Sequence, residues 1–451
     1  MKPANNKQSS TNLESNELVA PQTTIQTHLV DLWQEILEVK VGVHDNFFEL
    51  GGNSIKAALF FNRLQEKFGG VFYIVALFEA PTIAEFENYL HQYYPELVAR
   101  VLGKTVKQNP PTSCSRLKTN HIEQIRQLIR PLPTPSQQPS ISTKNQSACF
   151  ILSAPRSGST LLRVILAGHP QLFAPPQLCL LQFNTLAERK AILTGEYSFW
   201  REGTIQALKQ VEGYNSEEAQ ALMRHLEKQR LNTKEFYHWL QQRLEGKLLV
   251  DKTTTYPLNL ATLQKAETEF DKPVYIHLVR HPYGVIRSFE EAKLDITLTP
   301  FIPKLKDRNT FPFTRQELAE LLWLTSNQNI LTFLPSVPQH RQYTLQFENL
   351  VTQPETTVKH LCQFLNLDFD PQMLQPYATP QQKMTEGLNS KSGMLGDLKF
   401  HQHKSINPNV ANNWQNYYNF DFLSEPTWEL AQVLGYTKTL EKLSEREDGE
   451  L

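Results

Sequence analysis

The sequence predicts a small all-α domain of four helices, followed by a larger α/β domain with a central parallel sheet. Apolar residues recur every three or four positions over much of residues 24–93, as expected of amphipathic helices that pack into a bundle. From Ser147 onward, short apolar runs alternate with long helical stretches. This alternation indicates parallel strands whose two faces are covered by helices.

Composition divides the 451 residues into five segments. The N-terminal segment is rich in Asn, Ser and Gln without periodicity, which predicts disorder, and four prolines between Pro131 and Pro139 predict a stiff, exposed linker. Within this linker His121–Arg130 has one apolar face, so we expect it to dock on one of the domains. In order, the segments are a disordered tail, the helical domain, the Pro-rich linker, the α/β domain and a charged C-terminal tail, at residues 1–20, 21–95, 96–146, 147–440 and 441–451.

The helical pattern of the first domain has four parts. The first helix is predicted over Thr24–Val39. The second begins at Asn53 or Ser54, directly after a loop that ends in the pair Gly51-Gly52. A short apolar stretch, VALFEAPT, and a helix over Ile83–Tyr93 complete the bundle.

The second domain is predicted to contain at least four strands separated by helices. The strand candidates are the apolar runs Cys149–Ser153, Leu248–Asp251, Val274–Val279 and Tyr343–Phe347. The helical stretches include Ser216–Lys228, Thr233–Leu244, Arg315–Phe333 and Thr356–Leu365. Parallel sheets bind their ligands at the carboxyl ends of the strands, so functional residues are expected there.

The first of these strands leads into a loop that is suited to an anion. Small and hydroxyl-bearing residues, Ser157 to Thr160, stand where the next helix begins, and a helix N-terminus attracts negative charge. Arg156 adds a forked cationic donor that matches a phosphate. The nucleoside triphosphatase pattern GxxxxGK[ST] is absent, because APRSGST has neither its first Gly nor its Lys.

Charge and cysteine usage exclude several classes of protein. The chain has 45 Lys and Arg against 46 Asp and Glu, so no global field attracts nucleic acid or anionic lipid. The four cysteines lack the spacing of a metal site or a disulfide framework, which predicts a metal-free protein in the reducing cytoplasm. No signal peptide or membrane-spanning run is visible.

The segment DNFFELGGNSIKA resembles the phosphopantetheine attachment motif of acyl and peptidyl carrier domains. Helices before and after the motif, at the expected intervals, extend the resemblance over the whole first domain. By this resemblance Ser54 carries 4′-phosphopantetheine as a covalent cofactor, attached by a phosphopantetheinyl transferase. A helix N-terminus at this serine suits the phosphodiester that would form.

The second domain resembles the sulfotransferases that use PAPS, with PAP as the product. The run PRSGSTLL is similar to their loop for the 5′-phosphosulfate, RHPYGVIRS to their Arg and Ser that hold the 3′-phosphate, and GMLGDLK to their GxxGxxK segment. The resemblance covers most of residues 147–440 and keeps the order of the elements. The implied nucleotide-binding residues are Arg156, Ser157, Gly158, Ser159, Thr160, Leu161, Arg280, Ser288, Gly393, Gly396 and Lys399.

The resemblance also implies catalytic residues, and here the chain departs from the family. Arg156 and Lys252 are candidates to stabilise charge on the sulfuryl group. Gln177 and Cys179 stand where related enzymes have a Glu and a His, and Gln has no proton-accepting side chain. Cys179 could replace the base only if its pKa were lowered, and the further candidates for the base are His401 and His403.

The predicted function is transfer of a sulfuryl group from PAPS to a hydroxyl, the β-hydroxyl above all, of an acyl chain held by a phosphopantetheine carrier. The pattern is similar to sulfotransferase domains in cyanobacterial polyketide assembly lines, which implies polyketide or peptide synthase proteins as partners. The alternative is a domain that binds PAPS or PAP as a carrier-linked scaffold, with lost or altered catalysis. A P-loop kinase would need the absent GK[ST]. The acyl chain, a later elimination of sulfate and the oligomeric state stay open.

Overall fold

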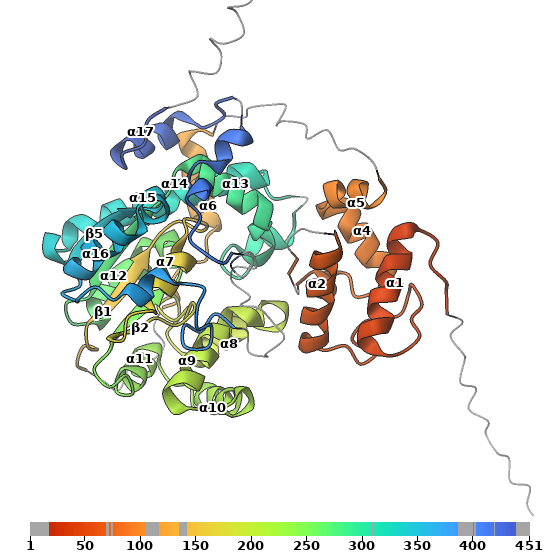
Figure 1. Ribbon diagram of the computed structural model, residues 1–451, viewed down its shortest axis with the longest axis horizontal. Helices are drawn as coiled ribbons and strands as arrows, with labels where there is room; N and C mark the ends of the chain where they lie inside the picture. The colour runs from red at the N-terminus through yellow and green to blue at the C-terminus, as the bar shows by residue number, and fades with distance from the viewer. Residues whose placement is uncertain are drawn as a thin grey trace, which may run out of the picture. The chain divides into compact units, whose positions relative to one another are not determined.

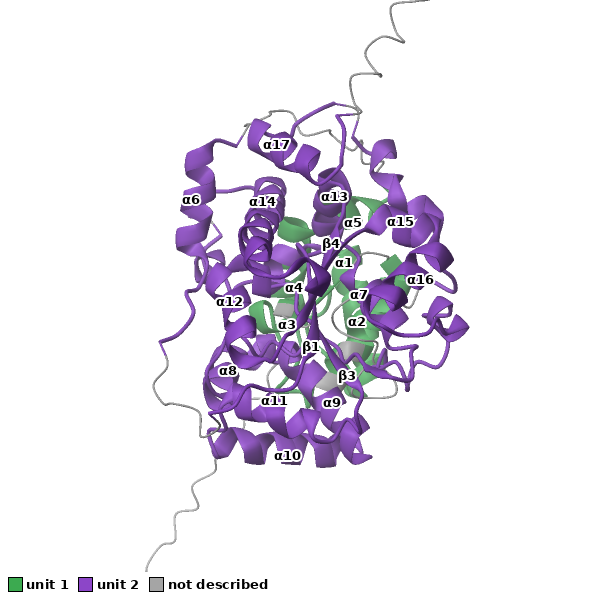
Figure 2. Ribbon diagram, turned by 90° about the vertical axis from the view of Figure 1, so that its left-hand side faces the viewer, with its two compact units in different colours: residues 1–107 green, residues 108–451 purple. Residues whose placement is uncertain are grey.

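The computed structural model describes residues 18–438, apart from 69–71, 74, 104–116, 135–141, 309, 387–399, 401–402 and 419. It divides the chain into two compact units, residues 1–107 and 108–451 (Figure 2). The predicted range 96–146 contains helical residues on both sides of this division.

Unit 1 is entirely helical in its described part (Figure 1). Its core is aromatic: the ring of Trp33 lies 4.9 Å from that of Phe47, and Phe60 lies 5.5 Å from Phe86. A short helix that begins at Pro95 extends the bundle beyond the four predicted parts, because proline is well placed in a first helical turn and Leu97 and Val98 are buried. The helices are α1 Thr24–Leu37, α2 Ser54–Phe68, α3 Val75–Glu79, α4 Ile83–Tyr93 and α5 Pro95–Val101.

Unit 2 contains a five-stranded sheet with the order β2-β3-β1-β4-β5, in which every pair is parallel. Ile151 of the central strand pairs with Lys252 on one side and with Ile276 on the other. The strands are β1 Ala148–Leu152, β2 Leu172–Phe173, β3 Leu248–Lys252, β4 Val274–Val279 and β5 Gln342–Gln346. The four predicted strands are confirmed, whereas the two-residue β2 was not predicted.

Helices cover both faces of this sheet. Phe150 and its neighbours of the same face pack on a cluster that includes α9–α12, and Ile151 packs with α7 and α16 on the other face. Figure 2 shows α12 and α14 on one side of the strands and α7 and α16 on the other. The helices are α6 Thr119–Leu128, α7 Ser159–Leu166, α8 Leu186–Ile192, α9 Glu202–Glu212, α10 Ser216–Lys228, α11 Thr233–Gln241, α12 Leu260–Glu269, α13 Pro282–Ala292, α14 Arg315–Phe333, α15 Phe347–Thr352, α16 Pro354–Phe364 and α17 Glu425–Val433.

The amphipathic segment of the linker docks on unit 2, as expected for its apolar face. Ile122 and Ile125 of α6 are buried in a cluster shared with α13, α14 and α17. Arg126 Nη2 donates to Gln328 Oε1 of α14 over 2.9 Å. The backbone N–H of Arg130 donates to the carbonyl of Phe301 over 2.8 Å, so the chain stays attached to unit 2 beyond the end of α6.

Candidate active site and carrier attachment site

The loop between β1 and α7 is tightly folded at the carboxyl edge of the sheet. Gly158 has φ +90°, and a Cβ atom there would lie 2.2 Å from Cδ2 of Phe347, the first residue of α15. Arg156 also adopts a positive φ, +68°. Only glycine fits at position 158, so the loop is held close to the residue that follows β5.

Predicted phosphate ligands from different segments contact one another at this edge. Arg280, directly after β4, donates through Nη1 to the carbonyl of Arg156 over 3.0 Å. Arg156 Nε in turn donates to Ser288 Oγ of α13 over 3.0 Å. Arg156 was expected beside the 5′-phosphosulfate and Ser288 beside the 3′-phosphate, so the structure joins the two predicted subsites through one side chain.

The Arg280 guanidinium is enclosed by apolar and backbone groups. It lies 4.4 Å from the ring centroid of Phe347, and its Nη2 donates to the carbonyl of Val410 over 3.3 Å. Among the described residues, nothing accepts a hydrogen bond from its buried Nε. Burial lowers the pKa of Arg280 to about 10, which leaves the group cationic at neutral pH. A partly buried cation with a buried, unsatisfied donor suits an anionic ligand.

Lys252 reaches the same loop from the neighbouring strand. Because β3 pairs with β1, the end of β3 lies beside the start of the loop, and Lys252 Nζ lies 3.5 Å from Thr160 Oγ1. Ser157, Ser159 and Thr160 are all buried, as is Leu161 in the first turn of α7. The hydroxyl of Thr160 therefore lies at the point where the Lys252 side chain reaches the loop.

Gln177 follows β2, the strand next to β3, and contacts the segment after Lys252. Its Oε1 accepts hydrogen bonds from both the backbone N–H and the hydroxyl of Thr254, each over 3.1 Å. Gln177 thus lies at the same edge of the sheet as Lys252. The structure brings this predicted residue near the loop, although it has no proton-accepting group.

Cys179 could act as a base only if its pKa were lowered, and the structure shows the opposite shift. Its side chain is fully buried, and this burial raises its pKa to about 12, although the nearby Arg189 opposes the rise. The thiol is therefore neutral at physiological pH. Sequence position alone had made Cys179 a candidate, and the environment that sets its pKa depends on the fold.

A buried polar network supports the segment around Cys179. Asp251 accepts hydrogen bonds from the hydroxyls of Tyr237 and Tyr256, and Thr253 donates to its other oxygen over 3.0 Å. Burial raises the pKa of Asp251, and these hydrogen bonds oppose the rise. The Tyr256 hydroxyl also accepts from the backbone of Leu180 over 2.9 Å. The network therefore links β3 to the loop after Gln177.

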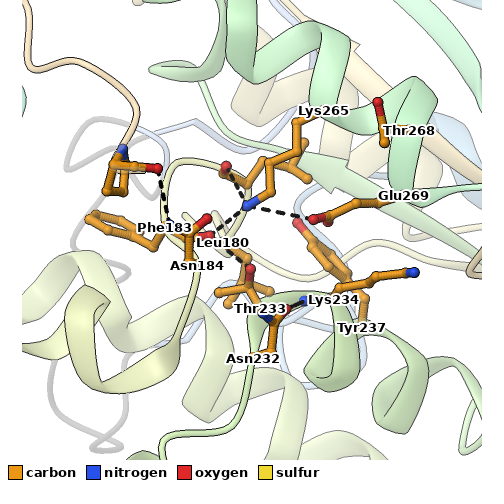
Figure 3. A network of polar contacts seen from close by, with 12 residues as sticks. Leu180, Phe183, Asn184, Asn232, Thr233, Lys234, Tyr237, Lys265, Thr268 and Glu269 are labelled. Atoms are coloured by element: carbon orange, nitrogen blue, oxygen red, sulfur yellow. Dashed lines mark hydrogen bonds and ion pairs between the residues drawn. The ribbon is translucent and has the colours of Figure 1, made fainter. Parts of the chain in front are cut away.

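A second network fixes the far end of that loop (Figure 3). Lys265 of α12 donates to the carbonyl of Phe183 over 2.6 Å and lies 3.6 Å from Glu269. Burial lowers the pKa of Lys265 and raises that of Glu269. Thr233 donates to the same carbonyl of Phe183 over 2.8 Å. Asn184 Nδ2 donates to the carbonyl of Pro133.

The other predicted residues of the second domain lie elsewhere or outside the described residues. The ring of His403 lies 6.2 Å from that of Tyr377, and its backbone N–H donates to the carbonyl of Phe400. Phe400 and Tyr377 belong to the cluster on the α7 and α16 face of the sheet, so these contacts do not connect His403 with Gln177. Gly393, Gly396, Lys399 and His401 fall outside the described residues.

The predicted attachment site in unit 1 lies at the start of α2. Asn53 caps this helix, because its Oδ1 accepts from the backbone N–H of Lys56 over 3.0 Å, and Ser54 is the first helical residue. Gly51 has φ +86°, and a Cβ atom on Gly52 would lie 2.3 Å from the carbonyl oxygen of Phe47. The two glycines are therefore required by the loop that brings the chain to Ser54.

Comparisons with known proteins decide the identity of both units. A model described as the sulfotransferase family matches residues 148–371, and one described as a phosphopantetheine attachment site matches residues 27–90. The solved sulfotransferase domain from the curacin biosynthetic pathway is 37% identical, with a TM-score of 0.58 over 65% of this chain and 99% of that domain. The chain belongs to the sulfotransferase family. Its sulfotransferase domain follows a carrier domain.

Two further similarities concern the setting of these domains. The sulfotransferase domain of the Synechococcus PCC 7002 olefin synthase is 36% identical, with a TM-score of 0.57 over 68% of this chain and all of that domain. The carrier domain is similar to surfactin synthase subunit 2 of Bacillus subtilis, at 45% identity over 76 residues. That match covers 17% of this chain and 2% of the synthase.

The structure adds residues to the candidate site that the sequence did not predict. Thr254 contacts Gln177, Phe347 packs on both Gly158 and Arg280, and Val410 accepts from Arg280 through its backbone. The run of three threonines after Lys252, at a strand end, was a signal for Thr254. The contact of Val410 uses its carbonyl group, which any residue carries.

Among the described residues, no helix is both long and apolar enough to cross a membrane.

Proposed function

We propose that the sulfotransferase domain transfers a sulfuryl group from PAPS to the β-hydroxyl of an acyl chain on a phosphopantetheine carrier. The observation that carries this proposal is the contact of Arg280 with Arg156 and of Arg156 with Ser288. Arg280 directly follows β4, Arg156 lies in the β1–α7 loop and Ser288 lies on α13, and the three predicted ligands meet at the sheet edge where nucleotide ligands of parallel sheets bind.

The donor fits the charge of this edge. Arg280 and Ser288 would hold the 3′-phosphate, and residues 156–160 with Lys252 would hold the 5′-phosphosulfate. Charge-assisted hydrogen bonds to such groups contribute about 1.5–3 kcal/mol each. Arg156 lies between the two groups, so it can contact either of them. Lys399 remains part of the proposal for the 3′-phosphate on the resemblance alone.

Chemically, the reaction needs the negative charge of the sulfuryl oxygens and of the leaving phosphate to be stabilised. Arg156 and Lys252 can supply hydrogen bonds there in a largely buried setting, where such bonds are stronger than in water. The S–O bond to the phosphate breaks, a new S–O bond forms to the acceptor oxygen, and the acceptor hydroxyl loses its proton. Gln177 cannot take this proton.

The carrier domain supplies the acceptor in this proposal. Ser54 would carry the arm, attached by a phosphopantetheinyl transferase, and its place at the first turn of α2 suits the phosphate of the arm. The curacin and olefin synthase relatives support a polyketide setting, and surfactin synthase supports a peptide synthase setting. Synthase proteins of one of these types would be the partners. We retain the proposed segment bounds 21–95 and 147–440 for the two domains, and a cytoplasmic location.

A second function is favoured by one specific observation. Gln177 has its acceptor oxygen engaged by Thr254, and Cys179 is a neutral buried thiol. A site without a base suits a carrier-linked scaffold that binds PAPS or PAP but has lost or altered its catalysis.

One experiment separates the two functions. The carrier is loaded with a β-hydroxyacyl-phosphopantetheine arm, and the intact mass of the full chain is measured before and after addition of PAPS. A gain of one SO₃ group that is lost with Arg280→Ala supports the enzyme. Binding of PAP without a gain in mass supports the scaffold, and neither binding nor a gain would refute both.

A further inference from the structure

Gln177 and Thr254 are partly exposed residues at the ends of two buried segments. Residues 178–181 are buried, and so are residues 251–253, yet Gln177 and Thr254 each retain solvent exposure. Thr254 lies at the carboxyl edge of the sheet, two residues beyond Lys252, whose side chain meets the β1–α7 loop. The pair is therefore partly accessible to solvent at the edge of the sheet where the proposed site lies.

The direction of the Gln177 amide is fixed by the backbone of Thr254. A backbone N–H can only donate, so the Gln177 atom that lies 3.1 Å from it must be the oxygen. The Thr254 hydroxyl donates to the same oxygen over 3.1 Å. Because both donors converge on Oε1, the amide nitrogen of Gln177 is the terminal atom turned away from Thr254.

The backbone that carries Gln177 is also held in place. A Cβ atom on Gly203 would lie 2.1 Å from the carbonyl oxygen of Gln177, so α9 packs directly on this peptide. Two residues after Gln177, the carbonyl of Cys179 accepts from Arg189 Nε over 3.1 Å, and the backbone N–H of Cys179 donates to Thr253 Oγ1 over 3.2 Å. A side chain on such a support keeps its orientation.

We propose that Thr254 is a positioning residue that orients residue 177 toward the acceptor, and that Gln177 presents its amide N–H groups to the acceptor oxygen. This inference rests on the proposed function. Gln177 then donates a hydrogen bond that holds the acceptor, while the proton of the hydroxyl leaves to water. The same two donors of Thr254 would equally hold one oxygen of a carboxylate, so the support for an acidic residue at position 177 is present in this chain.

The first test measures the support without any need for sulfuryl transfer. Gln177→Glu is prepared with ¹³C-labelled glutamate, and the pKa of the introduced carboxyl is followed by NMR, with its signal identified as the one that is absent from wild type labelled in the same way. Two hydrogen bonds to the ionised form should bring this pKa below the ordinary value of about 4.3. Adding Thr254→Val, which keeps the shape but removes the hydroxyl, should raise it by about one unit.

Thr255→Val is the matched control. It removes a hydrogen bond of the same type, from Thr255 to Gln182 Oε1 over 2.8 Å, one residue further along the chain. Thr255→Val should leave the pKa of the introduced carboxyl at position 177 unchanged. The positioning role of Thr254 would be overturned if the introduced carboxyl had the same pKa with and without Thr254→Val. It would also be overturned if Thr255→Val shifted this pKa as much as Thr254→Val does.

The second test uses the reaction. Thr254→Val alone should lower kcat/KM for the carrier-bound acceptor about tenfold, as expected when one oriented hydrogen-bonding group is lost, and Thr254→Ser should restore it. PAP affinity should stay unchanged in both. Gln177→Glu should raise transfer at least tenfold, because an oriented base typically contributes about 10²–10⁴.

The two tests fail in different ways. If no variant transfers a sulfuryl group, the proposed function is refuted while the carboxyl titration still decides the role of Thr254. If wild type transfers but Thr254→Val is as fast, or Thr254→Ser is as slow as Thr254→Val, the positioning role is refuted.

Discussion

Arg280→Ala offers the sharpest test of the nucleotide site. Arg280 is cationic, half-buried and bound to the carbonyls of Arg156 and Val410, and its Nε lacks an acceptor among the described residues. Charge-assisted hydrogen bonds to a phosphate contribute about 1.5–3 kcal/mol. Arg280→Ala should therefore weaken PAP binding about 10- to 150-fold. Binding of adenosine 5′-phosphate, which lacks the 3′-phosphate, should change about twofold or less.

Calorimetric titration of both nucleotides measures this difference. Arg287→Ala is the matched control, because Arg287 lies on α13 but pairs with Glu291 over 2.6 Å and stacks on Tyr417. It removes the same charge without touching the proposed site, so PAP affinity should be retained. Thermal unfolding of Arg280→Ala checks that the loss of its two carbonyl contacts has not unfolded the domain. Equal losses for the two nucleotides would refute the 3′-phosphate role.

Three further predictions concern the carrier site, the loop and the response to pH. Co-expression with a broad-specificity phosphopantetheinyl transferase should add the mass of one arm, and Ser54→Ala should abolish the addition; an arm that still attaches would sink this assignment. Gly158→Ala should lower the free energy of unfolding by about 2–4 kcal/mol, because it combines a strained positive φ with a clash on the Phe347 ring; urea unfolding near the wild-type midpoint would contradict the clash. Burial lowers the pKa of His277 to about 4, from its ordinary 6.5, so the unfolded chain binds more protons between these values and stability falls as the pH is lowered through that window. Between pH 7.5 and 5.5 this group should cost about 1.4 kcal/mol, and His277→Gln should remove that part of the slope. The same slope in the variant would show that His277 is not buried as a neutral ring.

Secondary-structure elements could be predicted from the sequence wherever an element has its own apolar pattern. Strands such as Val274–Val279 and helices such as α10 and α14 have the predicted bounds. The strand is a mostly apolar run that is buried along almost all of its length, and the buried residues of α10 recur at three- and four-residue spacing. β2 has two residues and cannot show a period. It exists through its pairing with β3, Leu172 beside Leu248, and such pairing is a property of the fold.

For the candidate site, the residues could be predicted from the sequence but their contacts could not. Arg156, Ser288 and Arg280 lie in local motifs, so their types and spacing could be recognised before the fold was known. Their contacts join residues more than a hundred positions apart, and no motif predicts that Arg156 would donate to Ser288. The pKa of Cys179 depends in the same manner on the atoms that surround it, so the sequence could name the residue but not its state.

The contact between Gln177 and Thr254 also bears on how to interpret the missing base. The backbone N–H and the hydroxyl of Thr254 are two donors that converge on one side-chain oxygen of residue 177. Here both donors are used, by an amide that is isosteric with the carboxylate. An amide and a carboxylate at this position differ in the second terminal atom, which in the amide donates a hydrogen bond and in the carboxylate can accept a proton. The reactivity of the side chain at position 177 can thus be varied without changing its position. Gln177→Glu changes the terminal group and keeps the side chain in place, whereas Gln177→Ala removes the side chain, so the rates of the two variants measure the two contributions separately.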